Sequence, residues 1–469
     1  MSILFRADSA SLALLLVLLG ACSTVAPTNQ AITQIDESSG YRRLNRERSA
    51  ALGENLVLLA FSGGGTRASA LSYGVMQELR DTLIDGRDGQ VRLLDEVDTI
   101  SSVSGGSFTA AYYGAFREQL FEDFEDDFLR REVQGELIKQ LFNPAHWWRS
   151  AFNGFDRTEM AIDYYDRNIF KGATFNDIQK LGPPFIDINA TDLTTGLRFT
   201  FSQNLFDLIC TDLGSYPIAR AVTASSAVPV AFPSIVLENH ADQCDIAGSR
   251  QWELLLREPE SEAQERLVEG LKSYRDVEKR KFIHLVDGGI SDNLGLRAMI
   301  DRAEGLGDHS FEQLKKFNVK NVLVVLVNAE VKPEQFIEES HEKPSVAATV
   351  ASITNAQMDA FNQETLDKVR TNLAHLRERS AKDNLAVRFY FAEVSFDQIQ
   401  TKEVSGFLNS MPTTLELEDV DVDRLITSGR ILLRHEPSFQ LFKHENNGKL
   451  VEGAMKDEVA CQYFDMLNC

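Results

Sequence analysis

The sequence predicts a three-layer α/β/α protein, in which a mostly parallel sheet lies between helices on both faces. Strand-like apolar runs alternate with helix-like runs from Asn55 onward, the pattern of a parallel sheet wrapped by helices. Val319–Asn328 is a near-continuous β-branched run, as expected of a strand buried on both faces. A glycine loop, a serine and an aspartate each follow a strand-like run, which is where open α/β sheets place their chemistry.

The glycine loop spans residues 62–67 (Ser-Gly-Gly-Gly-Thr-Arg) and follows the apolar run Asn55–Phe61. It lacks the Lys-Ser/Thr ending of a P-loop and the spacing of a dinucleotide-binding motif, so nucleotide binding is disfavoured. Its free backbone N–H groups can instead hold an oxyanion. The expected donors are Gly64 and Gly65, with Gly63 and Thr66 as further candidates. Arg67 could contact a substrate phosphate, but we favour a role in bracing the loop.

The serine motif spans residues 102–106 (Ser-Val-Ser-Gly-Gly) and precedes a helix-like run to Arg117. Ser104 on a tight strand-to-helix turn would expose its hydroxyl at the sheet edge. Gly105 and Gly106 let backbone and substrate approach closely. The helix that begins there directs its N–H groups and positive dipole end at the site. Ser104 is therefore the expected nucleophile.

The third motif is Asp287-Gly288-Gly289, and Asp287 is the expected base that takes the Ser104 proton. A Ser-His-Asp triad is the main rival. Of the eight histidines only His284 lies beside a motif, and on a strand it would face away from Asp287. We therefore favour a Ser-Asp dyad, which requires the aspartate to sit in a water-poor pocket. Asp292 is the alternative acid.

These three motifs, in this order, resemble those of the patatin-like phospholipase family. The resemblance covers roughly Asn55–Val327 and includes Asp187–Gly196 and Ala224–Pro233, the second rich in small residues and expected to pack beneath the site. It implies a Ser-Asp dyad that hydrolyses acyl esters of lipids without a cofactor. It also assigns supporting roles to the flanking residues of each motif, which are Arg67, Gly105, Gly106, Gly288 and Gly289. No acidic cluster looks like a calcium loop, so no metal is expected.

Two positions depart from the family pattern. Ser102 stands where the serine turn usually has glycine, and Ala68 stands where glycine usually follows the arginine. Both are small, so we expect an adjusted turn rather than inactivity. Asp187 and Asp192 flank a probable turn, and we expect them to hold it by side-chain to backbone hydrogen bonds.

Residues 1–21 resemble a lipoprotein signal peptide. The apolar run Leu12–Leu19 is too short to span a bilayer, and Leu19-Gly20-Ala21-Cys22 is similar to a bacterial lipoprotein box. Cys22 would then carry the lipid, although an ordinary secretory signal is the alternative. Ser23 in place of an aspartate favours the outer membrane, facing the periplasm. The polar residues 22–54 would form a tether.

The net charge of −22 argues against nucleic-acid binding and against attraction to anionic membranes. The sequence does not identify a protein partner. Four cysteines remain besides Cys22, an even number that permits two disulfides in an oxidising compartment. Sequence proximity favours Cys210–Cys244 and Cys461–Cys469, with four free buried thiols as the alternative.

We expect residues 55–330 to form the catalytic domain and residues 331–469 a C-terminal extension packed on it. The extension contains a long helix-like run (Ser345–Ser380), a strand-like run (Ala386–Val394) and a further helix around Val420–Leu433. Two insertions depart from the minimal core. Glu118–Phe170 reads as an amphipathic helix packed on the core, with a lipid-facing lid as the alternative. His240–Lys281 reads as a charged, helical, solvated segment or a flap.

The predicted function is therefore that of a lipid acyl hydrolase of the phospholipase A type, anchored at the bacterial cell envelope by Cys22 and acting on membrane phospholipid. Two alternatives stay open. One is a carboxylesterase or thioesterase acting on non-membrane esters. The other is a non-catalytic lipid-binding envelope protein built on the same scaffold.

Overall fold

The computed structural model describes residues 27–43, 53–86, 89–136, 156–229, 232–259, 261–306, 309–331, 341, 343–382 and 387–457. Several predictions from the sequence lie outside these residues. They concern the signal segment with Cys22, residues 137–155 of the first insertion, and the pair Cys461 and Cys469.

The molecule is organised around one eight-stranded sheet. Five strands run parallel to their neighbours in the order β12-β11-β2-β5-β6, whereas β10, β9 and the short β7 are antiparallel. The predicted mostly parallel sheet is therefore confirmed. The strands are β2 (Asn55–Phe61), β5 (Val97–Val103), β6 (Phe185–Asp192), β7 (Arg198–Thr200), β9 (Ile235–Glu238), β10 (Phe282–Val286), β11 (Asn321–Asn328) and β12 (Arg388–Ser395).

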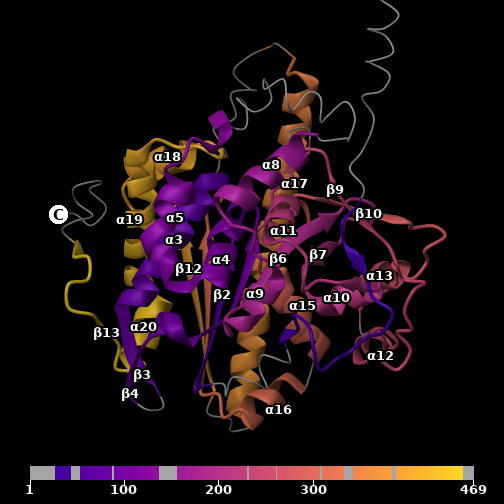
Figure 1. Cartoon of the computed structure of the whole chain (residues 1–469). Coiled ribbons are helices and arrows are strands. Elements are labelled where there is room, and N and C mark those ends of the chain that lie inside the picture. The colour runs from indigo at the N-terminus through magenta and orange to yellow at the C-terminus, as the bar shows by residue number, and fades with distance from the viewer. Residues whose placement is uncertain are drawn as a thin grey trace, which may run out of the picture.

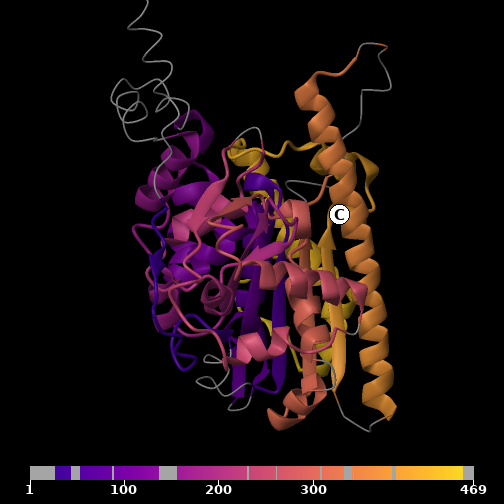
Figure 2. The same cartoon turned by 90° about the vertical axis from the view of Figure 1, so that its right-hand side faces the viewer.

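Helices cover both faces of this sheet because its central strands are apolar on both sides. In β11, Leu323 and Val325 point into one core, whereas Val322 and Leu326 point into the other. The first and larger core lies under α3 (Gly65–Asp81), α4 (Gly105–Phe116) and α11 (Ile218–Ser225), which are labelled in Figure 1. The second lies under α15 (Arg297–Leu306) and α17 (Val346–Lys382), and Figure 2 shows α17 running along one side of the molecule. The three-layer arrangement is thus confirmed.

The C-terminal elements predicted from the sequence are present as α17, β12 and α19 (Asp419–His435). β12 is the edge strand of the main sheet, paired in parallel with β11. α19 packs on α3, where the buried carboxylate of Glu78 accepts a hydrogen bond from the Arg434 guanidinium at 2.6 Å. The region after residue 330 therefore completes the sheet and one helical layer. A domain boundary at that residue remains a prediction.

No helix within the described part of the chain is both long and apolar enough to cross a membrane. This holds even for α17, which has 37 residues.

The two insertions differ in how they meet the core. In the first, α5 (Leu120–Phe124) and the turn after it bury Leu120, Phe124 and Phe128 completely. Packing on the core is therefore confirmed for this part, and the rest of a possible lid, residues 137–155, lies outside the described residues. The second insertion forms α12 (Arg250–Leu255) and α13 (Glu262–Ser273), helical as predicted. Both helices are partly buried, since Trp252, Val268 and Leu271 pack against the core.

A disulfide joins Cys210 to Cys244, as sequence proximity favours. Cys210 follows α10 (Gln203–Leu208), and Cys244 lies at the start of the second insertion. The bond therefore ties this insertion to the core, and the alternative of four free thiols is wrong for this pair.

Replacing both Cys210 and Cys244 with serine should lower the free energy of unfolding by about 2–4 kcal/mol, because the closed loop no longer restricts the unfolded chain. Urea unfolding of the oxidised wild type and of the double variant measures the difference. Equal unfolding midpoints and equal slopes would contradict a structural role for this bond.

Candidate active site

The turn that carries Ser104 is strained. β5 ends at Val103 and α4 begins at Gly105, so Ser104 alone makes the transition. Its backbone has φ 49° and ψ −122°, a region that residues with side chains rarely adopt. Such strain persists only where surrounding contacts hold it. The strand-to-helix turn predicted from the sequence is therefore present at this serine.

Ser225 at the end of α11 supplies one of those contacts. The N–H of Ser104 donates to Ser225 Oγ at 2.9 Å, and Ser225 Oγ donates to the carbonyl oxygen of Asn189 at 2.6 Å. The hydroxyl oxygen of Ser107 lies 3.0 Å from Ser225 Oγ. Ser225 thus links the serine turn to strand β6, and it belongs to the small-residue segment expected beneath the site.

The structure brings Ser104 and Asp287 together. Ser104 Oγ donates to Asp287 Oδ2 at 2.9 Å, and the N–H of Gly289 donates to Asp287 Oδ1 at 2.7 Å. The exposed fraction is only 8% for Ser104 and 7% for Asp287. Burial raises the pKa of Asp287 to about 6, against the lowering effect of these two hydrogen bonds. The carboxyl therefore sits in the water-poor setting that a dyad requires.

Asp287 reaches this position from an antiparallel strand. Asp287 directly follows β10, as the prediction of a strand-ended motif requires, and β10 runs antiparallel to β6 and pairs Val286 with Thr191. Because β10 ends beside the end of β6, its last residues reach the level of the serine turn. Gly288 is required there, since a Cβ on it would lie 2.2 Å from the carbonyl oxygen of Asn189.

The glycine loop packs directly on the serine turn. Gly64 and Gly65 have φ 141° and 60°, conformations that favour glycine. A Cβ on Gly105 would lie 2.0 Å from the carbonyl oxygen of Gly65, and a Cβ on Gly106 would lie 2.7 Å from Cβ of Phe61. Side chains at these positions would separate the N-terminal ends of α3 and α4, which converge at the site.

The loop N–H groups differ in whether they are free. The N–H of Gly63 donates to the carbonyl oxygen of Asn293 at 2.9 Å, and that of Thr66 donates to the carbonyl oxygen of Thr414 at 2.8 Å. Among the described residues, the N–H groups of Gly64 and Gly65 have no acceptor. Gly63 and Thr66 were further candidates in the sequence, but their N–H groups are engaged within the chain. Gly64 and Gly65 are left as the available donors.

Arg67 braces the loop against two distant segments. Its guanidinium donates to the carbonyl oxygens of Ala329 at 2.9 Å and Met411 at 2.6 Å, and to Thr413 Oγ1 at 3.1 Å. The side chain is almost fully buried, and burial lowers its pKa to about 10. The structure places Arg67 in the bracing role rather than toward a substrate phosphate.

The rival catalytic groups lie elsewhere. His284 Nδ1 lies 3.1 Å from Ser234 Oγ, and no histidine in the described ranges contacts Asp287 or Ser104. Asp292 Oδ2 accepts from the N–H of Arg297 at 2.9 Å, and burial raises its pKa to about 6. Ser102 Oγ donates to the carbonyl oxygen of Asp187 at 3.1 Å. None of these three has a hydrogen bond to the dyad.

Asp187 and Asp192 both lie in β6, and they have different roles. Asp192 Oδ1 accepts the N–H of Thr194 at 3.0 Å, which holds the turn as expected. Asp187 does not, and the expectation for it was wrong. Its carboxylate pairs with Arg43, because the side chain projects from the face of the sheet opposite α4.

Three residues at the site carried no signal in the sequence. Ser225 was covered only by the general expectation that its segment packs tightly. Asn293 and Thr414 act through backbone carbonyl oxygens, and any residue type supplies such an oxygen. A motif search therefore has nothing to find at these two positions.

Comparison with known proteins identifies the fold. A family model described as Patatin-like phospholipase matches residues 59–300, slightly more than half of the 469 residues. No curated protein matches the chain.

Two solved structures are distantly similar. Human GIVD cytosolic phospholipase A2 shows 13% identity and a TM-score of 0.33, covering 59% of this chain and 45% of that protein. VipD from Legionella pneumophila shows 12% identity and a TM-score of 0.30, covering 92% of this chain and 74% of that protein. The chain thus spans less than half the length of the human protein.

Replacing Asp287 with asparagine should change how stability depends on pH. The folded state holds the Asp287 proton up to pH about 6, whereas the ordinary pKa is 3.8. The wild type therefore loses stability as pH rises through this window, and asparagine does not titrate. We expect the free energy of unfolding of Asp287→Asn, relative to wild type, to rise by about 1 kcal/mol between pH 5 and pH 8.

Urea unfolding at the two pH values measures this change, with Ser102→Ala as the control that should show a constant difference from wild type. A constant difference for Asp287→Asn as well would contradict the raised pKa.

Proposed function

The chain belongs to the patatin-like phospholipase family, and we propose that it is a lipid acyl hydrolase of the phospholipase A type, with Ser104 as nucleophile and Asp287 as base. The observation that carries this proposal is the 2.9 Å hydrogen bond from Ser104 Oγ to Asp287 Oδ2. Beside it lie the N–H groups of Gly64 and Gly65, which have no acceptor among the described residues. A nucleophile, a base and oxyanion donors together suit acyl transfer.

In the first half-reaction, Ser104 Oγ attacks the ester carbonyl carbon and its proton passes to Asp287 Oδ2. The carbonyl oxygen becomes an oxyanion, which accepts hydrogen bonds from Gly64 and Gly65. The intermediate collapses by breaking the bond to the alcohol oxygen. That oxygen takes the proton from Asp287, so the lysolipid leaves neutral at this oxygen and the acyl group stays on Ser104.

In the second half-reaction, a water molecule attacks the acyl carbon and gives its proton to Asp287. The same N–H groups hold the oxyanion. The bond to Ser104 Oγ then breaks, Asp287 returns the proton to the serine, and the fatty acid is released. The enzyme ends in its starting state, and no external acid, base or metal is needed.

The setting of Asp287 suits this role. A base is most effective when its pKa lies near the working pH, and burial moves Asp287 to about 6. At neutral pH the carboxyl is then mostly ionised and ready to accept a proton. The Gly289 N–H fixes the other oxygen, so Oδ2 faces the serine.

Membrane phospholipid at the cell envelope is the proposed substrate. The lipoprotein-like segment ending at Cys22 would anchor the enzyme to the membrane, with the outer membrane favoured by Ser23. The Cys210–Cys244 disulfide supports an oxidising compartment such as the periplasm. Lipid attachment would also offset the charge of −22, which does not draw the protein to anionic surfaces.

Phosphatidylethanolamine and phosphatidylglycerol vesicles with different acyl chains at the two ester positions test the proposal. Wild type should release fatty acid, identified by mass spectrometry, and Ser104→Ala and Asp287→Asn should each lose at least about 10³-fold in rate. The matched controls Ser102→Ala and Asp292→Asn should retain activity, because neither side chain contacts the dyad.

The outcomes separate the alternatives. Release that persists in Ser104→Ala would overturn the site. No release from vesicles, together with Ser104-dependent cleavage of soluble esters or thioesters, would replace the phospholipase with an esterase. No hydrolysis of any ester would leave a lipid-binding scaffold.

A further inference from the structure

Two adjoining cavities lie on the α17 face of the sheet, away from the dyad. The larger, here called the polar cavity, has a volume of about 1440 Å³ and lies between α13, α15 and α17. The smaller, here called the apolar cavity, has a volume of about 240 Å³ and lies between the sheet, α15 and the C-terminal half of α17. Ser104, Asp287 and the glycine loop line neither of them.

The two cavities share part of their lining. Arg43, Arg302 and Gln313 border both, together with the apolar side chains of Phe185 and Ile300. One face of α17 runs past each in turn, with Phe361 and Thr365 at the polar cavity and Leu373 at the apolar one. The cavities therefore adjoin at these residues, one polar and one apolar, and together they are here called the chamber.

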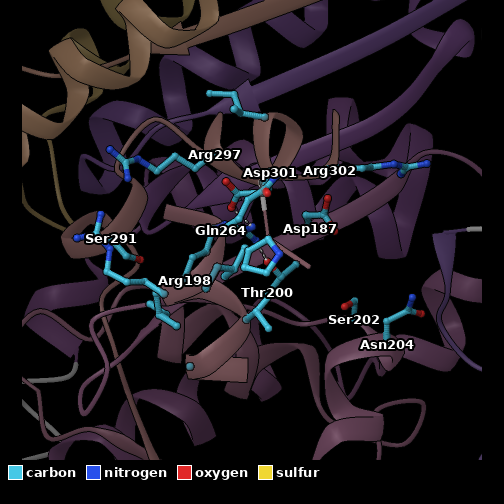
Figure 3. A pocket seen from close by; sticks show the side chains of 18 of the residues that line it. Asp187, Arg198, Thr200, Ser202, Asn204, Gln264, Ser291, Arg297, Asp301 and Arg302 are labelled. Atoms are coloured by element: carbon cyan, nitrogen blue, oxygen red, sulfur yellow. Dashed lines mark hydrogen bonds and ion pairs between the residues drawn. The ribbon is translucent and has the colours of Figure 1, made fainter. Parts of the chain in front are cut away.

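The lining of the polar cavity has more basic than acidic side chains, the opposite of the whole sequence. The whole sequence has 48 basic and 70 acidic residues, but nine basic and six acidic side chains line this cavity in the described ranges. Figure 3 shows Arg297 and Arg302 on either side of Asp301, with Arg198 below them. Arg198 Nε is buried without a hydrogen-bond partner, although the rest of the guanidinium binds Asp301 at 2.8 Å. This surplus of positive charge favours an anion.

The apolar cavity has the opposite character. Its lining is mostly Leu, Val, Ile and Phe, including Leu58, Met299, Val324 and Phe317. Cavities of about 150 Å³ with such walls stay dry and bind apolar molecules. A space of about 240 Å³ is therefore a site for hydrocarbon rather than for water.

We infer that this chamber binds an anionic amphiphile with a single acyl chain. The chain would enter the apolar cavity, and the anionic head would stay at the junction, near Arg302 and Arg43. The apolar cavity exceeds the roughly 150 Å³ of cavities that bind small apolar molecules but is too small for two acyl chains, so the end of one chain would enter it. A fatty acid and a lysophospholipid share this chemistry. Both are products of the reaction proposed above, so the source of the ligand rests on that proposal, whereas the existence of the site does not.

The wall of the polar cavity also includes a residue close to the Asp287 loop. Ser291, four residues after Asp287, lines the polar cavity, and Ser291 Oγ lies 2.8 Å from Thr191 Oγ1. Thr191 Oγ1 in turn donates to the carbonyl oxygen of Asp287 at 2.8 Å. Met358 of α17 would lie 3.4 Å from a Cβ on Gly289. Ser291 and Thr191 thus connect the wall of the polar cavity to the Asp287 loop.

Photo-cross-linking tests the inference without relying on hydrolysis. Full-length Ser104→Ala protein is incubated with diazirine-labelled palmitic acid or diazirine-labelled palmitoyl-lysophosphatidylglycerol, irradiated and mapped by peptide mass spectrometry. Adducts are expected in peptides from α15, β11 and the C-terminal half of α17, and excess unlabelled lipid should prevent their formation. Comparing the two probes identifies the source of the ligand.

Two variants with matched controls define the chamber. Val324→Phe fills the apolar cavity and should abolish the adducts, whereas Val420→Phe makes the same change at an exposed site of α19 and should not. Arg302→Gln removes a junction cation and should weaken binding by roughly tenfold, whereas Arg370→Gln on the outer face of α17 should not. Thermal melting confirms that each variant folds.

Adducts confined to peptides of the glycine loop and the serine turn, or equal yields for Val324→Phe and Val420→Phe, would overturn the site. Equal affinities for Arg302→Gln and Arg370→Gln would overturn the placement of the head group. Loss of vesicle hydrolysis would bear only on the proposed function, because the binding measurement uses the inactive Ser104→Ala protein.

Discussion

The close contact between the glycine loop and the serine turn is the constraint on which the site depends. Gly65 and Gly105 approach until a Cβ on Gly105 would lie 2.0 Å from the Gly65 carbonyl oxygen. That approach brings the N-terminal ends of α3 and α4 together at the serine turn, where their positive dipole ends favour developing negative charge. It requires a left-handed backbone at Gly64 and Gly65 and a strained φ of 49° at Ser104. The surrounding structure has to supply the contacts that hold this arrangement.

Much of that support comes from segments far away in the sequence. Ser225 holds the serine turn by accepting the Ser104 N–H, and Arg67 joins the loop to Ala329 and Met411. The buried pair of Glu78 and Arg434 binds α3 to α19. The region after residue 330 is therefore part of what positions the glycine loop. Its removal would take away the Met411 and Thr413 acceptors of Arg67 and the Arg434 partner of Glu78, and should therefore destabilise the loop and α3.

Local patterns in the sequence predict the sheet, the long C-terminal helix and the Ser104–Asp287 pairing, because each has its own signature of periodicity or motif. What the sequence does not predict depends on pairing between distant segments. The antiparallel course of β10 cannot be seen in Phe282–Val286, since a five-residue apolar strand reads alike in either direction. Thr414 and Asn293 act through backbone oxygens, which carry no sequence signal. Asp187 was misread because its partner, Arg43, lies 144 residues earlier.

Labelling with a fluorophosphonate probe, mapped by peptide mass spectrometry, tests most directly the claim that Asp287 activates Ser104. We expect one adduct, on Ser104, which forms in wild type and in Asp292→Asn protein and is lost in Asp287→Asn protein. An adduct on Ser102, or on Ser104 at an unchanged rate in Asp287→Asn protein, would contradict it.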